Sequence, residues 1–190
     1  MVTWFDYKLY QHPELLEHLR DVIIAEYKEW SSKYDPIKDT QKFSDRYGAG
    51  EDLGWYACPL IDVQKVRKDF APQWPKTVEA LQALPGILNA AVNFIQPNSI
   101  VPPHTDEAYD LHESIQGKGV QAWGTVIGIS MPSDDASVVG FTIGEDVRSW
   151  KTGDIVSFNG YEIHAGWNYS NQWRVTILVE INKKYWNVVE

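Results

Sequence analysis

The clearest pattern of apolar and polar positions in the chain predicts a helix over residues 13–30. Apolar residues recur there at spacings of three and four, and charged residues fill the positions between them. Pro13 suits the first position of a helix, where no backbone donor is needed. The apolar face consists of Leu15, Leu16, Leu19, Val22, Ile23 and Tyr27.

Two shorter helices are predicted further along, over residues 61–70 and 76–84, and the second ends at Pro85 and Gly86. Between the long helix and these two, residues 31–60 are polar, aromatic and spaced by glycines. Such a composition is typical of a long loop or an irregular hairpin. Loops of this length inside compact domains are usually functional or mobile.

From residue 87 onward the pattern changes to short strands bounded by Gly, Pro, Asn or Asp. The strands are expected over residues 88–95, 120–131, 138–143, 147–150, 154–158 and 173–181. No helix separates them, which favours an antiparallel sandwich or barrel. We expect a mainly β fold with N-terminal helices (α+β): one domain over residues 1–190, in which a helical and loop region at 1–86 packs on a jelly-roll core at 87–190 and its helices cover one sheet.

Composition narrows the possible partners and compartment. The formal net charge is −9, and the basic residues are scattered, which argues against nucleic acid as a partner. Cys58 is the one cysteine, which excludes an internal disulfide and fits an inert core residue in a reducing compartment. The chain starts without a basic leader followed by an apolar run, and no apolar stretch approaches membrane-spanning length. These features predict a cytoplasmic protein without a membrane partner.

A candidate metal site begins at His104 and Asp106, which lie two residues apart and would share one face of an extended strand. His164, sixty residues later, follows a predicted strand and a turn and is the best candidate for a third ligand. Two imidazoles and a carboxylate can bind iron(II) on one face and leave the opposite positions open. Each histidine taken alone is more simply explained as a structural residue.

Arg174 adds a second candidate function. It opens the strand at 173–181, in which Val175 and Ile177 fall on one face and Arg174 and Thr176 on the other. Both faces are largely apolar, so the strand is expected to be buried on both sides. A buried guanidinium needs an anionic partner, which is either a protein carboxylate or a dicarboxylate ligand.

The order of these residues resembles the aspartyl/asparaginyl β-hydroxylase family of iron(II)- and 2-oxoglutarate-dependent dioxygenases, over residues 91–181. The resemblance rests on the approach to His104 through residues 97–103, on residues 128–132, and on the closing segment from residue 150 to Arg174. It implies a double-stranded β-helix of cupin type, iron(II) bound by His104, Asp106 and His164, and 2-oxoglutarate and O2 as co-substrates. It also assigns the distal carboxylate of 2-oxoglutarate to Arg174.

The resemblance leaves the near carboxylate of 2-oxoglutarate without a firm partner, because family members often carry basic residues where this chain has Gly124 and Val126. The candidates for that contact are Asn93, Gln121, Trp123 and Thr125. Asp106 favours hydroxylation over halogenation, since the carboxylate fills the position that a halide would need.

Two polar aromatic stretches, residues 46–56 and 107–114, are candidate walls of a substrate pocket. The substrate residues proposed there are Arg46, Trp55, Glu107 and Tyr109. Their mixed charges suit an amino acid, an amino-acid derivative or a protein Asp or Asn side chain, hydroxylated at an unactivated C–H bond. Two other interpretations stay open: a cupin-type metalloenzyme that does not use 2-oxoglutarate, and a non-enzymatic Trp-rich β-sandwich that binds a carbohydrate or peptide.

Overall fold

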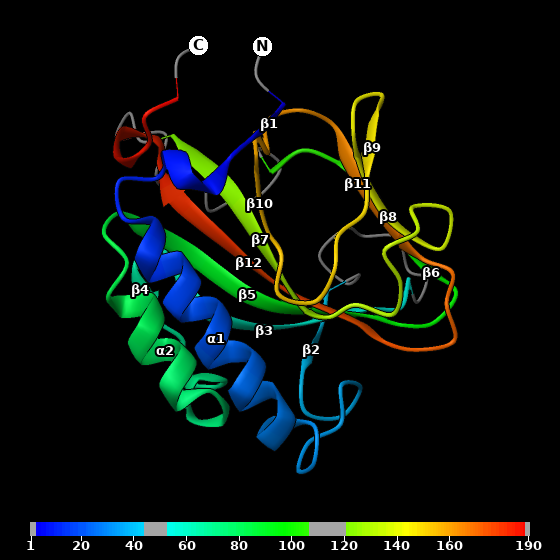
Figure 1. Cartoon of the computed structure of the whole chain (residues 1–190). Coiled ribbons are helices and arrows are strands. Elements are labelled where there is room, and N and C mark those ends of the chain that lie inside the picture. Colours follow the sequence, from blue (N-terminus) through cyan, green and yellow to red (C-terminus); the bar gives the residue numbers. More distant parts are fainter. Residues whose placement is uncertain (1–2, 44–52, 107–120, 189–190) are drawn as a thin grey trace.

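The computed structural model describes residues 3–43, 53–106 and 121–188 of the 190-residue chain. Two sheets and two α-helices make up the fold (Figure 1). The helical segments are η1 (Tyr7–Leu9), α1 (Pro13–Trp30), η3 (Ala71–Gln73), α2 (Pro75–Gln82) and η5 (Lys183–Tyr185). The strands are β1 (Trp4–Phe5), β2 (Gln41–Lys42), β3 (Trp55–Asp62), β4 (Lys65–Val66), β5 (Ile87–Ile95), β6 (Ser99–His104), β7 (Ala122–Ser130), β8 (Val139–Ile143), β9 (Asp146–Arg148), β10 (Ile155–Phe158), β11 (His164–Asn168) and β12 (Arg174–Asn182).

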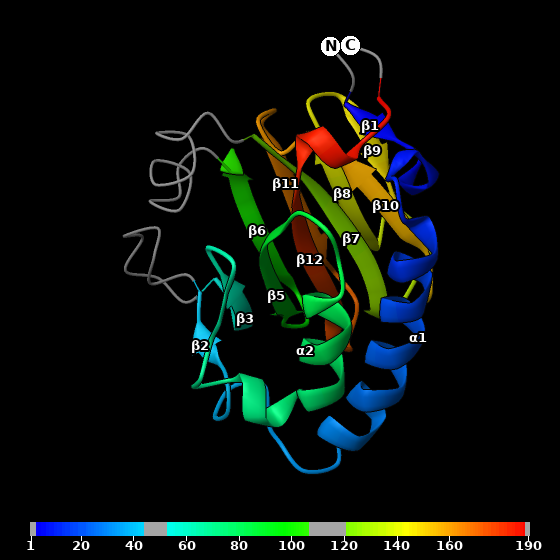
Figure 2. The ribbon, with the colours of Figure 1, turned by 90° about the vertical axis from the view of Figure 1, so that its left-hand side faces the viewer.

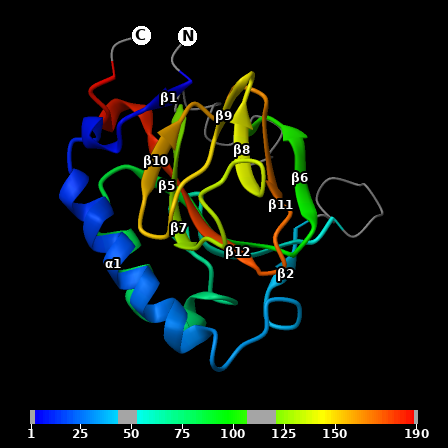
Figure 3. The same cartoon turned by 45° about the vertical axis from the view of Figure 1, so that its right-hand side comes forward.

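The larger sheet has eight strands in the order β1-β10-β7-β12-β5-β3-β2, with β4 paired to β3. The smaller sheet has the order β6-β11-β8-β9, and all strand pairs are antiparallel. Helices α1 and α2 lie on one face of the larger sheet, and the smaller sheet lies on the opposite side (Figures 1 and 3). This confirms the mainly β, jelly-roll class of fold with helices covering one sheet.

Helix α1 has the predicted bounds and buries the predicted face. Leu16, Leu19 and Ile23 are fully buried, because the three- and four-residue spacing directs them onto the larger sheet. Glu26 on the same face is also buried, and its two carboxylate oxygens accept hydrogen bonds from the backbone N–H groups of Lys76 and Thr77. A carboxylate at this position satisfies otherwise unpaired donors at the start of α2. Glu26 therefore holds the N-terminus of α2 against α1.

The main core lies between the helices and the larger sheet. In β12, Val175, Ile177, Val179 and Ile181 are fully buried against this core, as the alternation of the strand predicts. Cys58 is fully buried in the same core, and burial raises the pKa of its thiol to about 12, consistent with an inert residue. The side chains on the opposite face of β12, of which Arg174 is the first, point into the space between the two sheets.

One local prediction for the first third of the chain is wrong. Residues 61–70 do not form a helix: β3 continues to Asp62, turns through Val63 and Gln64, and returns as β4. Both turn residues have positive φ, as a tight two-residue hairpin requires. Sheet pairing with β5 prevails here over the local helical pattern.

Residues 31–60 were expected to form a long loop or an irregular hairpin, and the antiparallel pairing of β2 with β3 in this stretch matches the hairpin. Residues from Trp55 onward form β3, an almost entirely buried strand between β5 and β2. The larger sheet thus takes four strands from residues 1–86 (β1, β2, β3 and β4), so this region is not only helix and loop. Strand β11 also forms where the sequence pattern predicts none.

The two ends of the described chain meet at one end of the molecule (Figure 2). Tyr10 pairs with Trp186 in an isolated β-bridge, and the side chains of both residues are buried in the main core. Among the described residues, no helix is both long and apolar enough to cross a membrane.

Candidate metal centre

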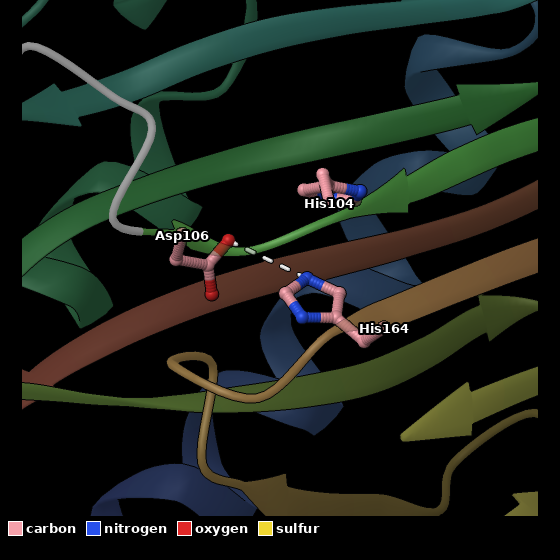
Figure 4. A group of neighbouring side chains, drawn as sticks. All are labelled: His104, Asp106 and His164. Carbon is pink, nitrogen blue, oxygen red and sulfur yellow. Dashed lines mark ion pairs between the residues drawn. The ribbon is translucent and has the colours of Figure 1, made fainter. Parts of the chain in front are cut away.

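The structure brings together the three predicted metal ligands. One ligand atom from each of His104, Asp106 and His164 lies within 4.8 Å of the others. His104 ends β6 and His164 begins β11, and the two residues are partners in the register of these strands. Figure 4 shows the Asp106 carboxylate turned toward the His164 imidazole, with Asp106 Oδ1 3.5 Å from His164 Nε2. Asp106 follows the strand rather than lying on it, so a turn aims the carboxylate at the site.

Both imidazoles are oriented by backbone carbonyls close by in the sequence. Nδ1 of His104 lies 2.7 Å from the carbonyl oxygen of Pro102, and Nδ1 of His164 lies 2.9 Å from that of Glu162. A carbonyl oxygen only accepts hydrogen bonds, so each neutral ring carries its proton on Nδ1. In the neutral ring Nε2 then bears the lone pair, which is the arrangement that a metal ligand needs.

Gly160 positions the carboxylate of Asp106. The backbone N–H of Asp106 donates to the carbonyl oxygen of Gly160 at 2.9 Å, and the Asp106 side chain occupies the space where a Cβ of residue 160 would stand. Only glycine leaves this space open. Asp106 is 4% exposed, so its carboxylate has little freedom to move elsewhere.

Replacing Gly160 by alanine should therefore displace the Asp106 carboxylate and weaken metal binding about 10- to 100-fold, the range for loss of a supporting contact. Titration of Mn(II) by calorimetry would measure the loss. Gly144→Ala is the control, because a Cβ at Gly144 meets no atom within 4 Å, although its positive φ adds backbone strain. A Gly160→Ala protein that binds Mn(II) as tightly as the control would contradict this role.

The two histidines have pKa values shifted in opposite directions. Burial lowers the pKa of His104, and the neighbouring His164 lowers it further, so the ring is neutral near pH 7. For His164, burial acts in the lowering direction, but the hydrogen bond and charge of Asp106 outweigh it, so its pKa is raised. The charge of Glu180 acts in the same raising direction.

Metal binding is therefore expected to weaken as the pH falls, because the metal must displace a proton from His164. The folded pKa of His164 lies above its ordinary value, so the competing proton is absent at high pH and present below that pKa. Below the pKa, the apparent Kd for Mn(II) should rise about tenfold for each pH unit. Calorimetry from about pH 8 to about pH 6 in buffers of different ionisation enthalpy measures both affinity and proton release. A flat affinity with no proton release would contradict this linkage.

Arg174 lies in the space between the sheets and is 3% exposed. Nη1 donates to the carbonyl oxygens of Gly140 at 3.0 Å and Trp167 at 3.4 Å, and the guanidinium lies 5.4 Å from the ring centroid of Trp150. Nε is buried without a hydrogen-bond partner, and no carboxylate of the described residues forms an ion pair with Arg174. Burial lowers its pKa to about 10, so it stays charged at neutral pH.

Arg174 and the three candidate ligands line one cavity of about 120 Å³. Gly166 of β11 lies beside the guanidinium, since a Cβ there would stand 2.9 Å from Nη1 of Arg174. His164 is two residues away along the same strand. The alternation of β12 places Thr176, Leu178 and Glu180 along the wall of this cavity after Arg174. The cavity thus combines a candidate metal centre with a buried cation that has no anionic partner among the residues that the structure describes.

Two of the other predicted site residues, Asn93 and Trp55, also reach the cavity. Trp55 Nε1 donates to Asn93 Oδ1 at 3.0 Å, and the Trp55 ring lies 5.7 Å from that of His104. The structure does not bring Trp123 and Thr125 to the cavity. Both lie on the helix-facing side of β7, because they alternate with Gly124 and Val126, which face the other way. Thr125 is fully buried and its hydroxyl bonds to that of Ser157.

The remaining predicted substrate residues, Arg46, Glu107 and Tyr109, lie outside the described residues. Gln121, the other candidate for the near carboxylate, is exposed and does not line the cavity; its side chain lies near Lys183.

Asn168, part of the segment that suggested the family, has a structural role: its buried amide donates to the carbonyl oxygens of Ile95, Gln96 and Gln172.

Sequence reasoning missed two residues of the site, Gly160 and Glu180. Glu180 is 8% exposed, lines the cavity and shares the face of β12 that carries Arg174. The even spacing from Arg174 was a sufficient signal for Glu180. Gly160 had no such signal, because its role depends on a close approach to Asp106 across the fold.

The fold and the site together define a jelly-roll chain of two antiparallel sheets with a candidate metal centre of two histidines and one aspartate. The Aspartyl/Asparaginyl beta-hydroxylase family matches residues 17–184, and the chain belongs to this family. The match extends well beyond residues 91–181, where the sequence motifs showed a resemblance. Membership indicates a hydroxylase.

Among solved structures, the chain is similar to an oxidoreductase of the 2OG-Fe(II) oxygenase family from Burkholderia pseudomallei, with 9% identity and a TM-score of 0.51, over 84% of this chain and 77% of that one. It is also similar to a Cupin_2 domain of an XRE family transcriptional regulator from Enterobacter cloacae, with 14% identity and a TM-score of 0.42, over 67% and 96%. At these identities the likeness concerns the fold alone. The comparison with curated proteins gave no significant match.

Proposed function

We propose that the chain is an iron(II)- and 2-oxoglutarate-dependent oxygenase that hydroxylates an unactivated C–H bond of an amino-acid-like substrate. The observation that carries this proposal is Arg174: a buried guanidinium that pairs with no carboxylate of the described residues, in the same cavity as His104, Asp106 and His164. An unpaired buried charge is costly, so a cavity that contains one suits an anionic ligand.

The residues present fit iron(II). Two imidazoles and one carboxylate converge on one point, and a backbone carbonyl at Nδ1 of each imidazole leaves Nε2 as the atom that would bind the metal. With 2-oxoglutarate and O2, a bound iron(II) would supply the oxidation that removes a hydrogen atom from the substrate and returns a hydroxyl group. Asp106 fills a ligand position that a halide would need, which favours hydroxylation.

The protein's own contribution is placement and exclusion of water. The planar fork of Arg174 matches the geometry of a carboxylate and would hold the distal carboxylate of 2-oxoglutarate. Phe141 and Phe158 pack against His164 with ring centroids 5.5 Å apart in both cases, and they make the wall behind it apolar. Asn93, held by Trp55, offers a polar contact to the co-substrate.

The first experiment is anaerobic addition of iron(II) and 2-oxoglutarate, which should give a visible charge-transfer band. Oxygen should then produce succinate from the 2-oxoglutarate. His104→Ala should lose both effects, because the candidate centre would keep only two ligands. Absence of the band from the unmodified protein would refute the proposed co-substrate.

Titrating 2-oxoglutarate into iron-loaded protein also separates the two alternatives. A metalloenzyme that does not use 2-oxoglutarate would respond to the metal only, and a carbohydrate- or peptide-binding sandwich would respond to neither. Within residues 3–43, 53–106 and 121–188 no carboxylate pairs with Arg174, which favours the oxygenase, since the plain metalloenzyme would need a protein carboxylate at this position.

A further inference from the structure

The side chain of Trp4 in β1 lies in the apolar cluster behind the candidate metal centre. Its register partner in β10 is Phe158, so both side chains are on the face of the larger sheet that looks toward the smaller one. Trp4 is 9% exposed, and the exposed Arg148 lies over its ring, with the guanidinium carbon 4.8 Å from the ring centroid. A side chain close to one end of the described chain therefore reaches the interior between the two sheets.

Trp4 is connected to the candidate ligand His164 through two phenylalanines. Its ring centroid lies 5.8 Å from that of Phe141 and 6.0 Å from that of Phe158. Both of these rings pack against the His164 imidazole at 5.5 Å, Phe141 nearly parallel to it and Phe158 edge to face. Loss of the Trp4 ring would leave a cavity into which both phenylalanines could shift, and the imidazole would lose its fixed support.

Trp4 is connected to Arg174 through a second indole, that of Trp150. The two indole rings lie edge to face with centroids 6.4 Å apart, and the guanidinium carbon of Arg174 lies 5.4 Å from the centroid of Trp150. Trp150 is 4% exposed and lies beside Gly128, where a Cβ would stand 3.2 Å from its Cδ1 atom. An aromatic face stabilises a cation and favours one orientation of the planar guanidinium. A shift of Trp150 would therefore change the direction in which the fork of Arg174 points.

The backbone next to Trp4 makes a separate contact with the site. The carbonyl oxygen of Thr3 accepts from the backbone N–H of Asn159 at 3.0 Å, and the carbonyl oxygen of the next residue, Gly160, accepts from that of Asp106. This contact does not involve the Trp4 side chain. A substitution of Trp4 therefore tests the ring separately from the strand that carries it.

We propose that Trp4 is a positioning residue that holds His164 and Arg174 in a fixed relation to each other. The two phenylalanines carry its effect to the imidazole, and the second indole carries it to the guanidinium. Rings in a close-packed cluster cannot move independently, so one side chain sets the position of both groups. The part that concerns the co-substrate rests on the proposed function.

The test compares Trp4→Ala with Phe5→Ala, the neighbouring position in β1. Phe5 points to the opposite face of the sheet and packs in the main core against Trp123 and Trp186, at centroid distances of 4.7 and 5.1 Å. Both variants should unfold at a lower temperature than the unmodified chain, because each loses a packed ring. Only Trp4→Ala should weaken the binding of Mn(II), and of 2-oxoglutarate to the Mn(II)-loaded protein, each about tenfold by calorimetry. Trp4→Phe keeps an aromatic ring and should restore most of both affinities.

A second readout needs neither metal nor co-substrate. The NMR signals of the Arg174 Nε–H group and of the His164 ring nitrogens report the surroundings of the two groups in the metal-free protein. Trp4→Ala should shift both sets of signals, and Phe5→Ala should leave them in place.

Equal losses of affinity in Trp4→Ala and Phe5→Ala would overturn the proposal, because they would show a general loosening of β1. Unchanged affinities in Trp4→Ala, or unchanged NMR signals of either group, would also overturn it. If Trp4→Ala does not fold, Trp4→Leu is compared with Phe5→Leu. If the unmodified chain does not bind 2-oxoglutarate, the proposed function fails, and the NMR signals of the metal-free protein still decide the role of Trp4.

Discussion

Replacing Arg174 by alanine is expected to raise the 2-oxoglutarate concentration for half-maximal succinate formation about a hundredfold or more, while the iron(II) requirement changes little. The guanidinium is buried, so truncation removes charge-assisted hydrogen bonds that water cannot replace. It does not touch the three candidate metal ligands. Titrating each component at saturating levels of the other measures the two requirements separately, and equal losses would indicate a structural arginine.

Arg148→Ala is the matched control, because Arg148 is exposed, contacts Asp146 and the ring of Trp4, and does not line the cavity. A second variant tests the charge itself. Arg174→Met keeps most of the side-chain volume, and the ligand-free protein should unfold at the same or a higher temperature than the unmodified chain, since an unpaired buried charge disfavours folding. A structural arginine would instead lower the unfolding temperature when removed.

Replacing His164 by alanine should lower turnover roughly a thousandfold or more, beyond the 10- to 100-fold typical of losing a supporting contact. His164 is 3% exposed, begins β11 and is the residue against which Asp106, His104, Phe141 and Phe158 all pack. Its loss removes a ligand and also leaves the buried Asp106 carboxylate without its imidazole partner. Metal content after anaerobic loading and succinate formation are the two measurements.

The control for His164→Ala is His18→Ala, at an exposed position on α1. It should keep full metal content and turnover. His164→Ala protein that retains a full complement of iron and normal turnover would show that the three residues are a structural cluster. Retained iron with lost turnover would show that His164 acts in the reaction without being needed for metal binding.

Much of the site could be predicted from the sequence because its residues obey short-range rules. Strand alternation separates Arg174 from Val175, and the structure places the first in the cavity and the second in the core. The same rule, applied to Gly124 and Val126, would have excluded Trp123 and Thr125 from the cavity. Trp123 and Thr125 were proposed to contact 2-oxoglutarate because their side chains can form hydrogen bonds. The face of the strand that each occupies was not considered.

Other features depend on contacts between distant segments and had no local signal. Residues 61–70 have a helical pattern but become a hairpin because β3 pairs with β5. The requirement for glycine at residue 160 arises only when Asp106, two residues beyond the end of β6, approaches it in the fold. Sequence periodicity reports how one element is divided between two faces, and it carries no information about which other segment will lie against either face.

The carbonyls that hold the two imidazoles have a consequence for how this cavity can be altered. Pro102 and Glu162 each lie two residues before the histidine they orient, and they act through backbone atoms that every amino acid possesses. Part of each ring's orientation is therefore encoded within a tripeptide, and this part does not depend on the side chains that line the rest of the cavity. Lining positions that do not contact the two imidazoles could be exchanged in engineering experiments without loss of the tautomer that these carbonyls impose.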